Sequence, residues 1–163
     1  MKLFTKALLA LYLLTLLWLV LFKLSFDISA VLLEHQARSL NLVPFTDALQ
    51  GNLRETIDNI IVFVPLGLLL GVNFRQVSWR RKLAFVFIVS LVTELLQFVL
   101  AIGITDITDV ITNTSGGLLG LGLYSLSKRY FDTENLDRVI VITTATILIL
   151  LILFRVLFLR VRY

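Results

Sequence analysis

Long apolar runs, separated by short polar stretches, dominate this chain. A helix that crosses a membrane needs roughly 20 predominantly apolar residues. On that criterion we expect a single all-α integral membrane domain over residues 1–163, with about five transmembrane helices, at residues 7–26, 59–74, 83–102, 107–127 and 139–154. The second run is short for a span and contains Pro65, so we expect it to be thin or kinked.

The stretch between the first two runs, residues 27–57, is mixed in polarity. Within it, Ser39–Phe45 is apolar but is broken by Pro44 and is too short to span. We expect this segment to lie at the membrane interface or to re-enter the membrane from the extracytoplasmic side. Residues 103–106 are predicted to form a glycine-led turn between the third and fourth spans.

Composition supports the membrane class and narrows the chemistry. The chain is 58% hydrophobic and only 16% charged, which is far more apolar than a water-soluble domain. It has no cysteine, so disulfides, thiol nucleophiles and thiolate metal sites are excluded. A single histidine, His35, cannot form a histidine-rich metal centre. We therefore predict no metal, no cofactor and no nucleic-acid partner.

Lysine and arginine residues near the ends of the predicted spans indicate the orientation. If the N-terminus is cytoplasmic, the cytoplasmic side holds nine of them: Lys2, Lys6, Arg75, Arg80, Arg81, Lys82, Lys128, Arg129 and Arg138. The opposite side then holds six, three of which lie in the C-terminal tail: Lys23, Arg38, Arg54, Arg155, Arg160 and Arg162. We predict a cytoplasmic N-terminus and an extracytoplasmic C-terminus.

Acid and amide side chains interrupt the apolar runs, and in this orientation they share the outer half of the membrane. At about 1.5 Å rise per residue, Glu94 and Asn113 lie roughly 12 and 9 Å from the outer ends of their helices. Ionisable groups are costly in hydrocarbon and usually mark a functional site. The candidate binding residues are Asn59, Glu94, Gln97, Asp106, Asp109 and Asn113, with Arg54 just outside the second span.

Helical spacing places these side chains on common faces. Glu94 and Gln97 are i, i+3 neighbours, and Asp106, Asp109 and Asn113 follow i, i+3, i+7. Small residues, which allow close helix packing in lipid, accompany them. They are Gly67 and Gly71 on the second span, and Gly116, Gly117 and Gly120 on the fourth. We expect the second, third and fourth spans to pack together with their polar groups turned inward.

A purely structural interpretation of the same residues is also open. The buried acids could hydrogen-bond to neighbouring threonines and amides and thereby fix the helix register. Asp106, Asp109 and Asn59 could also cap the starts of their helices. Arg54 could pair with Asp58 at i, i+4, or it could contact an anion beside Asp106 and Asp109.

Three stretches in this order and spacing resemble the VanZ family: Asn59-Ile-Ile-Val-Phe-Val-Pro-Leu-Gly67, Glu94-Leu-Leu-Gln97 and the stretch from Asp106 to Gly120. The Ser39–Phe45 segment fits the family too, and the resemblance extends from the first span through residues 136–139. It implies a multi-pass protein of the bacterial cytoplasmic membrane. It also implies resistance to the lipid-tailed glycopeptide teicoplanin, without the wall rewiring that gives vancomycin resistance.

The family resemblance supplies no catalytic residues, so several functions remain open. The first is a binding protein whose outward polar pocket engages a membrane lipid, a lipid-linked wall precursor or teicoplanin, with Ser39–Phe45 as a lid. The second is an enzyme acting on an extracytoplasmic lipid or glycan through Glu94, Asp106 and Asp109. The third is a small lipid transporter, formed as a homodimer through the glycine faces.

Overall fold

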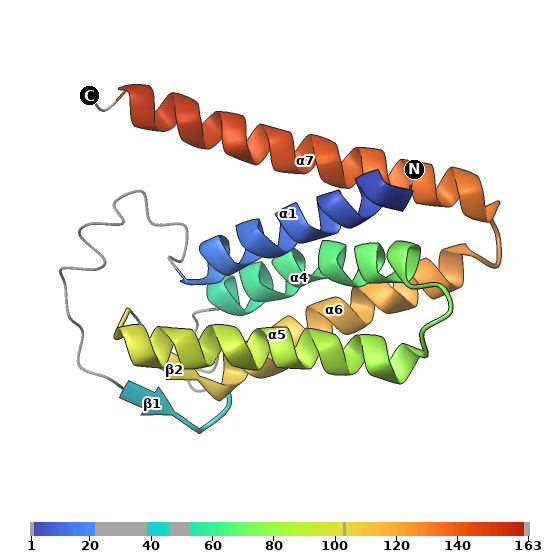
Figure 1. The fold of residues 1–163 in the computed structure, drawn as a ribbon. Coiled ribbons are helices and arrows are strands. Elements are labelled where there is room, and N and C mark those ends of the chain that lie inside the picture. The colour runs from blue at the N-terminus through green and yellow to red at the C-terminus, as the bar shows by residue number, and fades with distance from the viewer. Residues whose placement is uncertain (1, 22–38, 46–52, 103, 162–163) are drawn as a thin grey trace.

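The computed structural model describes residues 2–21, 39–45, 53–102 and 104–161 of the chain. Within these residues it contains five α-helices and two three-residue strands (Figure 1). In chain order they are α1 (Lys2–Leu21), β1 (Ser39–Asn41), α4 (Leu53–Asn73), α5 (Trp79–Leu100), β2 (Ile104–Asp106), α6 (Ile107–Ser127) and α7 (Thr133–Val161). The all-helical expectation is thus met apart from the short strands.

The five helices run in alternating directions, so the bundle has two distinct ends (Figure 1). One end holds the two strands, the end of α5 and the start of α6, and we call it the ladder end. The other holds the start of α1 and the α4–α5 and α6–α7 connections, and we call it the basic end. Helix α4 lies in the middle and contacts each of the other four helices.

Four of the described helices, α1, α4, α5 and α7, are long and apolar enough to cross a membrane. Helix α6 has the predicted bounds, 107–127, and is as long as α4, but its first half carries the polar stripe. Helix α4 begins six residues before the predicted start at Asn59 and runs through Pro65. The expectation of a short second segment is therefore wrong, because the polar turns before Asn59 are helical too.

Glycine allows α4 and α6 to approach until their backbones touch. A β-carbon added at Gly67 would lie 2.2 Å from the carbonyl oxygen of Gly117, and one added at Gly120 would lie 2.1 Å from that of Val64. A β-carbon at Gly116 would meet the Ile60 carbonyl oxygen at 2.2 Å. The predicted packing of the second and fourth spans is confirmed. These glycine faces are filled within one chain, so a homodimer would need another surface.

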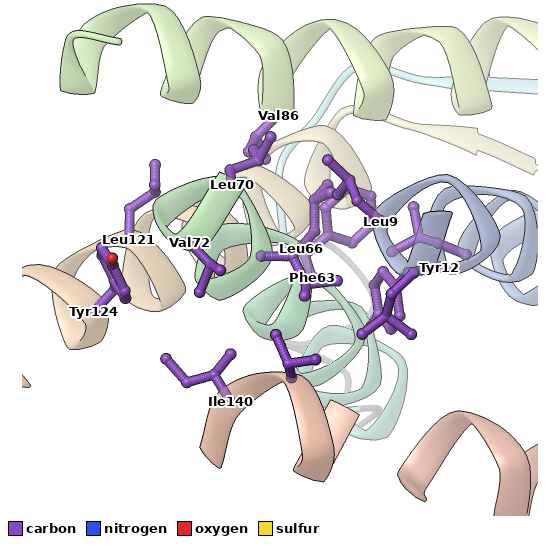
Figure 2. Close-up of a cluster of buried hydrophobic side chains, with 14 of the residues drawn as sticks. Leu9, Tyr12, Phe63, Leu66, Leu70, Val72, Val86, Leu121, Tyr124 and Ile140 are labelled. Carbon is purple, nitrogen blue, oxygen red and sulfur yellow. The ribbon is translucent and has the colours of Figure 1, made fainter. Parts of the chain in front are cut away.

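A cluster of buried apolar side chains from all five helices forms the core (Figure 2). Phe63 and Leu66 of α4 lie at its centre and have no solvent exposure. The Tyr12 hydroxyl of α1 donates to the Val62 carbonyl oxygen at 2.6 Å. This carbonyl is adjacent to that of Ile61, which lacks its helical partner because Pro65 has no N–H. A hydrogen bond between α1 and α4 therefore lies beside the proline in the otherwise apolar core.

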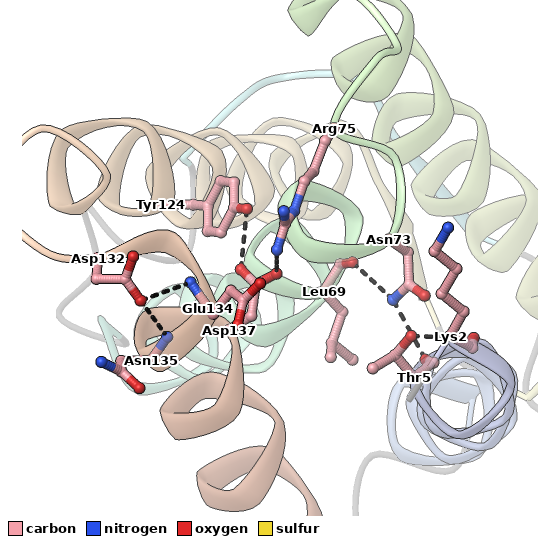
Figure 3. Close-up of polar contacts among 10 residues, drawn as sticks. All are labelled: Lys2, Thr5, Leu69, Asn73, Arg75, Tyr124, Asp132, Glu134, Asn135 and Asp137. Carbon is pink, nitrogen blue, oxygen red and sulfur yellow. Dashed lines mark hydrogen bonds and ion pairs between the residues drawn. The ribbon is translucent and has the colours of Figure 1, made fainter.

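At the basic end, a buried carboxylate connects three elements (Figure 3). Asp137 of α7 is 3% exposed; it pairs with Arg75 from the α4–α5 connection and accepts a 3.0 Å hydrogen bond from the Tyr124 hydroxyl of α6. The hydrogen bond to Asp137 raises the pKa of the Arg75 guanidinium above its ordinary value. The Arg75 guanidinium therefore stays charged at neutral pH, and its contact with Asp137 fastens α7 to the α4–α5 connection, while Tyr124 links Asp137 to α6.

We expect Asp137→Ala to loosen α7 and to lower the free energy of unfolding by about 2 kcal/mol, because Arg75 and Tyr124 lose their acceptor. Thermal unfolding of the purified chain, followed by circular dichroism, measures this loss. Asp137→Asn keeps an acceptor for Tyr124, so it should lose less stability. Equal stability of wild type and Asp137→Ala would show that this contact does not hold α7.

Candidate functional site

The two strands join the segment after α1 to the start of α6. They pair in parallel, with Asn41 opposite Asp106. The Asn41 side-chain amide donates to Asp106 Oδ2 at 2.9 Å, while Asp106 Oδ1 accepts from the Thr108 backbone N–H at 2.7 Å and caps α6. The capping role predicted for Asp106 is confirmed. Residues 104–106, expected to form a turn, are the strand β2.

Glu94 of α5 contacts the last two residues of β2, Thr105 and Asp106. Its Oε2 atom accepts from the Asp106 backbone N–H at 3.1 Å, and its carbonyl oxygen accepts from the Thr105 hydroxyl at 3.4 Å. The Glu94 side chain is only 2% exposed although it carries a carboxylate. The third and fourth spans therefore meet where the sequence predicted, and the contact involves the last residue of β2.

Asp109 lies in the first turn of α6 and faces α4. Its Oδ1 atom accepts from the Asn59 side-chain amide at 2.7 Å, and the residue is 6% exposed. Asn59 sits in the second turn of α4, not at its first residue, so the capping interpretation of Asn59 is wrong. The amide instead links α4 to the carboxylate of α6.

Asn113, one further turn along α6, faces α5. Its side-chain amide donates to the Ser90 hydroxyl oxygen at 3.1 Å, and both residues are completely buried. Among the described residues, no group donates a hydrogen bond to Asn113 Oδ1. Buried acceptors in proteins are usually satisfied by protein or by ordered water. This oxygen is therefore open to a hydrogen-bond donor.

Six side chains from α4, α5 and the start of α6 thus form what we call the polar cluster: Asn59, Ser90, Glu94, Asp106, Asp109 and Asn113. Two predicted site residues lie apart from it. The Gln97 amide donates at 3.0 Å to the Val20 carbonyl oxygen of α1, on another face of α5. The Arg54 guanidinium is exposed and pairs with Asp58 at 3.7 Å.

Sequence reasoning missed two contributors to this region, Ser90 and Asn41. Ser90 precedes Glu94 by four residues and shares its helical face, so the i, i+4 spacing could have identified it. Asn41 gave no comparable signal, whereas Thr108 was among the threonines expected to bond the buried acids. The Thr108 hydroxyl accepts from the Phe45 backbone N–H at 2.9 Å, and Phe45 has a positive φ of 62°. These contacts fasten residues 39–45 over the start of α6.

The two ends of the bundle differ in charge. Among the described residues, the ladder end holds five acids, Glu55, Asp58, Glu94, Asp106 and Asp109, and three bases, which are Arg54 and, in the last turns of α7, Arg155 and Arg160. All nine bases counted above for the cytoplasmic side lie at the basic end. The described residues contain no group of three or more His, Cys, Asp or Glu side chains placed to hold a metal ion. The polar cluster offers carboxylate, amide and hydroxyl oxygens, which suit a ligand that donates hydrogen bonds.

The Asn41–Asp106 contact can be tested by exchanging its partners. In Asp106→Asn, two side-chain amides would face each other, so we expect the melting temperature to fall, with a loss of about 1 kcal/mol. The double variant Asn41→Asp, Asp106→Asn restores one donor and one acceptor and should recover most of that loss. Thermal unfolding of the wild type, both single variants and the double variant gives the coupling free energy between positions 41 and 106. If the losses of the two single variants simply added up in the double variant, the contact between these side chains would be contradicted.

Comparisons with known proteins agree with the sequence features. The family model VanZ/LLP1 matches residues 9–128. The curated Protein VanZ of Enterococcus faecium is 54% identical over 162 residues, covering 99% of this chain and 98% of that protein. No solved structure matches the chain.

Proposed function

Because this chain belongs to the VanZ/LLP1 family, we propose that it confers resistance to teicoplanin from the bacterial cytoplasmic membrane. We propose further that it acts by binding. The polar cluster would engage a head group, a lipid-linked wall precursor or teicoplanin itself, and residues 39–45 would cover its entrance.

The placement of charge supports an outward-facing cluster. Loops rich in lysine and arginine remain in the cytoplasm, so the basic end is the inner one. The N-terminus then lies inside and the polar cluster lies in the outer half of the bilayer. Helix α6 would be the fifth span, since its Ile111, Leu119 and Leu123 side chains are exposed. A ligand arriving from outside would meet the ladder end first.

The buried acceptor of Asn113 is the observation that carries the binding proposal. An unsatisfied buried carbonyl oxygen costs about 1–3 kcal/mol, and a ligand hydroxyl, amide or ammonium group would recover part of that cost. Glu94 lies one turn from Ser90 on α5, and Asp109 lies one turn from Asn113 on α6. A carboxylate accepts stronger hydrogen bonds from such a donor than a neutral group does.

Expression in a susceptible Gram-positive host tests the activity. We expect the teicoplanin concentration that stops growth to rise several-fold over the empty vector, while the vancomycin concentration stays unchanged. Equal susceptibility of expressing and empty cells, with the protein present in the membrane, would refute the proposed resistance.

Titration of the purified protein tests the mode of action. Teicoplanin, vancomycin and wall-precursor lipids are added in turn, and at least one should bind saturably. Lipid and precursor extracts of expressing and empty cells should be identical if the protein binds without catalysis. A new modified lipid or glycan in the expressing cells would favour the enzyme alternative, with Glu94, Asp106 and Asp109 as its candidate residues.

A further inference from the structure

The polar cluster becomes more buried with distance from the ladder end. Asn59 and Asp106 are half-buried, whereas Asp109 is 6% exposed and Glu94 is 2% exposed. Asn113, the member furthest along α6, is completely buried. A ligand that enters from the ladder end would therefore meet Asn59 and Asp106 first, and Asn113 would lie at the deep end of its path.

The amide at this deep end has an open acceptor beside a carboxylate. Its nitrogen donates to the Ser90 hydroxyl oxygen at 3.1 Å, and among the described residues nothing donates to Asn113 Oδ1. Asp109 is its i−4 neighbour on α6, so the two β-carbons lie about 5–6 Å apart. Glu94 lies one turn along α5 from Ser90. A single small donor group between Asp109 and Asn113 could therefore contact both side chains.

We propose that the polar cluster binds a primary ammonium group. The inference rests on the proposed binding role of the cluster and names the chemical group that is bound. The six members comprise three acids and no base. An ammonium group is compact, positively charged and has three N–H donors. A carboxylate has two oxygen atoms that can each accept more than one hydrogen bond, so Asp109 can accept from the ligand and keep its bond from Asn59.

The other polar groups of a lipid or wall precursor fit this cluster less well. A phosphate or diphosphate is itself negative, so the acids would repel it, and its ionised oxygens cannot donate to Asn113 Oδ1. A hydroxyl or amide group could donate to this oxygen, but it would bring no positive charge to the acids. The phosphate of such a ligand would therefore stay outside the cluster while its ammonium group lies within.

Two lipids with the same acyl chains test the proposal, namely phosphatidylethanolamine and phosphatidylcholine. Both head groups carry one positive charge, but only ethanolamine has N–H donors. The full chain is released from bilayers containing equal parts of the two, and the retained lipids are counted by native mass spectrometry. We expect the wild type to retain several-fold more phosphatidylethanolamine than phosphatidylcholine.

Three variants locate the origin of this excess. Asn113→Leu removes the open oxygen at similar side-chain size and should lose most of the excess. Asp109→Asn removes a charge but keeps an acceptor for Asn59, so the fold should be retained and the excess should again fall. Asp137→Asn is the matched control, because it neutralises a buried acid at the basic end, and it should retain the lipids like the wild type. An excess that persisted in both Asn113→Leu and Asp109→Asn would overturn the proposal.

Soluble amines distinguish a lipid from a soluble source of the ammonium group. Ethanolamine and choline are added separately to the protein in phosphatidylcholine bilayers, and thermal unfolding is followed. If ethanolamine stabilised the wild type but not Asn113→Leu, and choline stabilised neither, the cluster would bind an ammonium group whether or not a lipid carries it. Equal retention of the two lipids, together with no effect of ethanolamine, would overturn the proposal.

Teicoplanin susceptibility, measured separately, distinguishes failure of this inference from failure of the proposed function. If the amine preference were found but expressing cells were no more resistant than empty cells, the proposed resistance would fail and the ammonium site would stand. If resistance depended on Asp109 but neither amine probe bound, the resistance function would stand and the ammonium site would fail.

Discussion

Gly120→Ala is expected to prevent α4 and α6 from packing, although it adds only one methyl group. That group would lie 2.1 Å from the Val64 carbonyl oxygen and 3.0 Å from the Gly67 α-carbon. Both are backbone atoms of α4, so no side chain can rotate away and the helices must separate. We expect a loss of about 3 kcal/mol or more in the free energy of unfolding. Thermal unfolding and size-exclusion chromatography in detergent would measure it.

Gly122→Ala provides the matched control on the same helix. A β-carbon added there meets no atom within 4 Å. Alanine is a better helix former than glycine by about 1 kcal/mol, so this variant should unfold at an unchanged or higher temperature. If Gly120→Ala were as stable as Gly122→Ala, the close approach of α4 and α6 would be wrong, and with it the placement of Asn59 against Asp109.

Removal of charge from the polar cluster is expected to abolish resistance while leaving the fold intact. Asp109→Asn keeps an oxygen that can accept from Asn59, and Glu94→Gln keeps one for the Asp106 N–H, yet neither retains a carboxylate. Under the binding proposal, teicoplanin susceptibility should return to that of the empty vector. Glu94→Ala removes both charge and acceptor and should have at least as large an effect. Growth inhibition is measured at matched protein levels in the membrane.

Asp137→Asn is the control for these variants, because it neutralises an equally buried carboxylate at the opposite end of the bundle. It should cost some stability but leave resistance unchanged wherever the protein level is maintained. If Asp109→Asn and Glu94→Ala both retained full resistance, the acids of the polar cluster would serve only to hold helices together. The same conclusion would follow if resistance fell only in proportion to the amount of protein.

The sequence predicted the bounds of a helix well where polar residues mark both of its ends. Helix α6 has the predicted bounds, because a polar cap and a charged loop flank it. Helices α4 and α7 begin earlier than expected, at Leu53 and Thr133. Their first turns are polar, so hydropathy does not detect them, although a helix can continue beyond the hydrocarbon into the interface. Residues 22–26, predicted as the end of the first span, lie outside the described residues.

The contacts that the sequence could not reveal are those between distant segments. The β1–β2 pairing joins residues 65 positions apart through strands of only three residues, which are too short to show an alternating pattern. Asp137 lies just before the predicted fifth span, next to Arg138, and its partner Arg75 is 62 residues away. Charge alone does not distinguish such a buried pair from two surface residues.

For the candidate site, helical spacing identified the stripe on α6 but not its partners. Asp109 and Asn113 share a face by spacing, yet the first contacts α4 and the second contacts α5, because α6 packs in the groove between them. Gln97 shares a stripe with Glu94 by the same rule, but its amide extends to α1. Which neighbour a side chain meets depends on packing geometry, which a one-dimensional pattern does not contain.

The central claim is that the polar cluster lies at the extracytoplasmic end of the bundle, and cysteine labelling in intact cells tests it most directly. The chain has no native cysteine, so Leu42→Cys at the ladder end and Tyr130→Cys at the basic end each report one site, and both positions are exposed. A membrane-impermeant maleimide should label the Leu42→Cys protein in intact cells and the Tyr130→Cys protein only after permeabilisation. The reverse pattern would place the polar cluster on the cytoplasmic side and contradict the account.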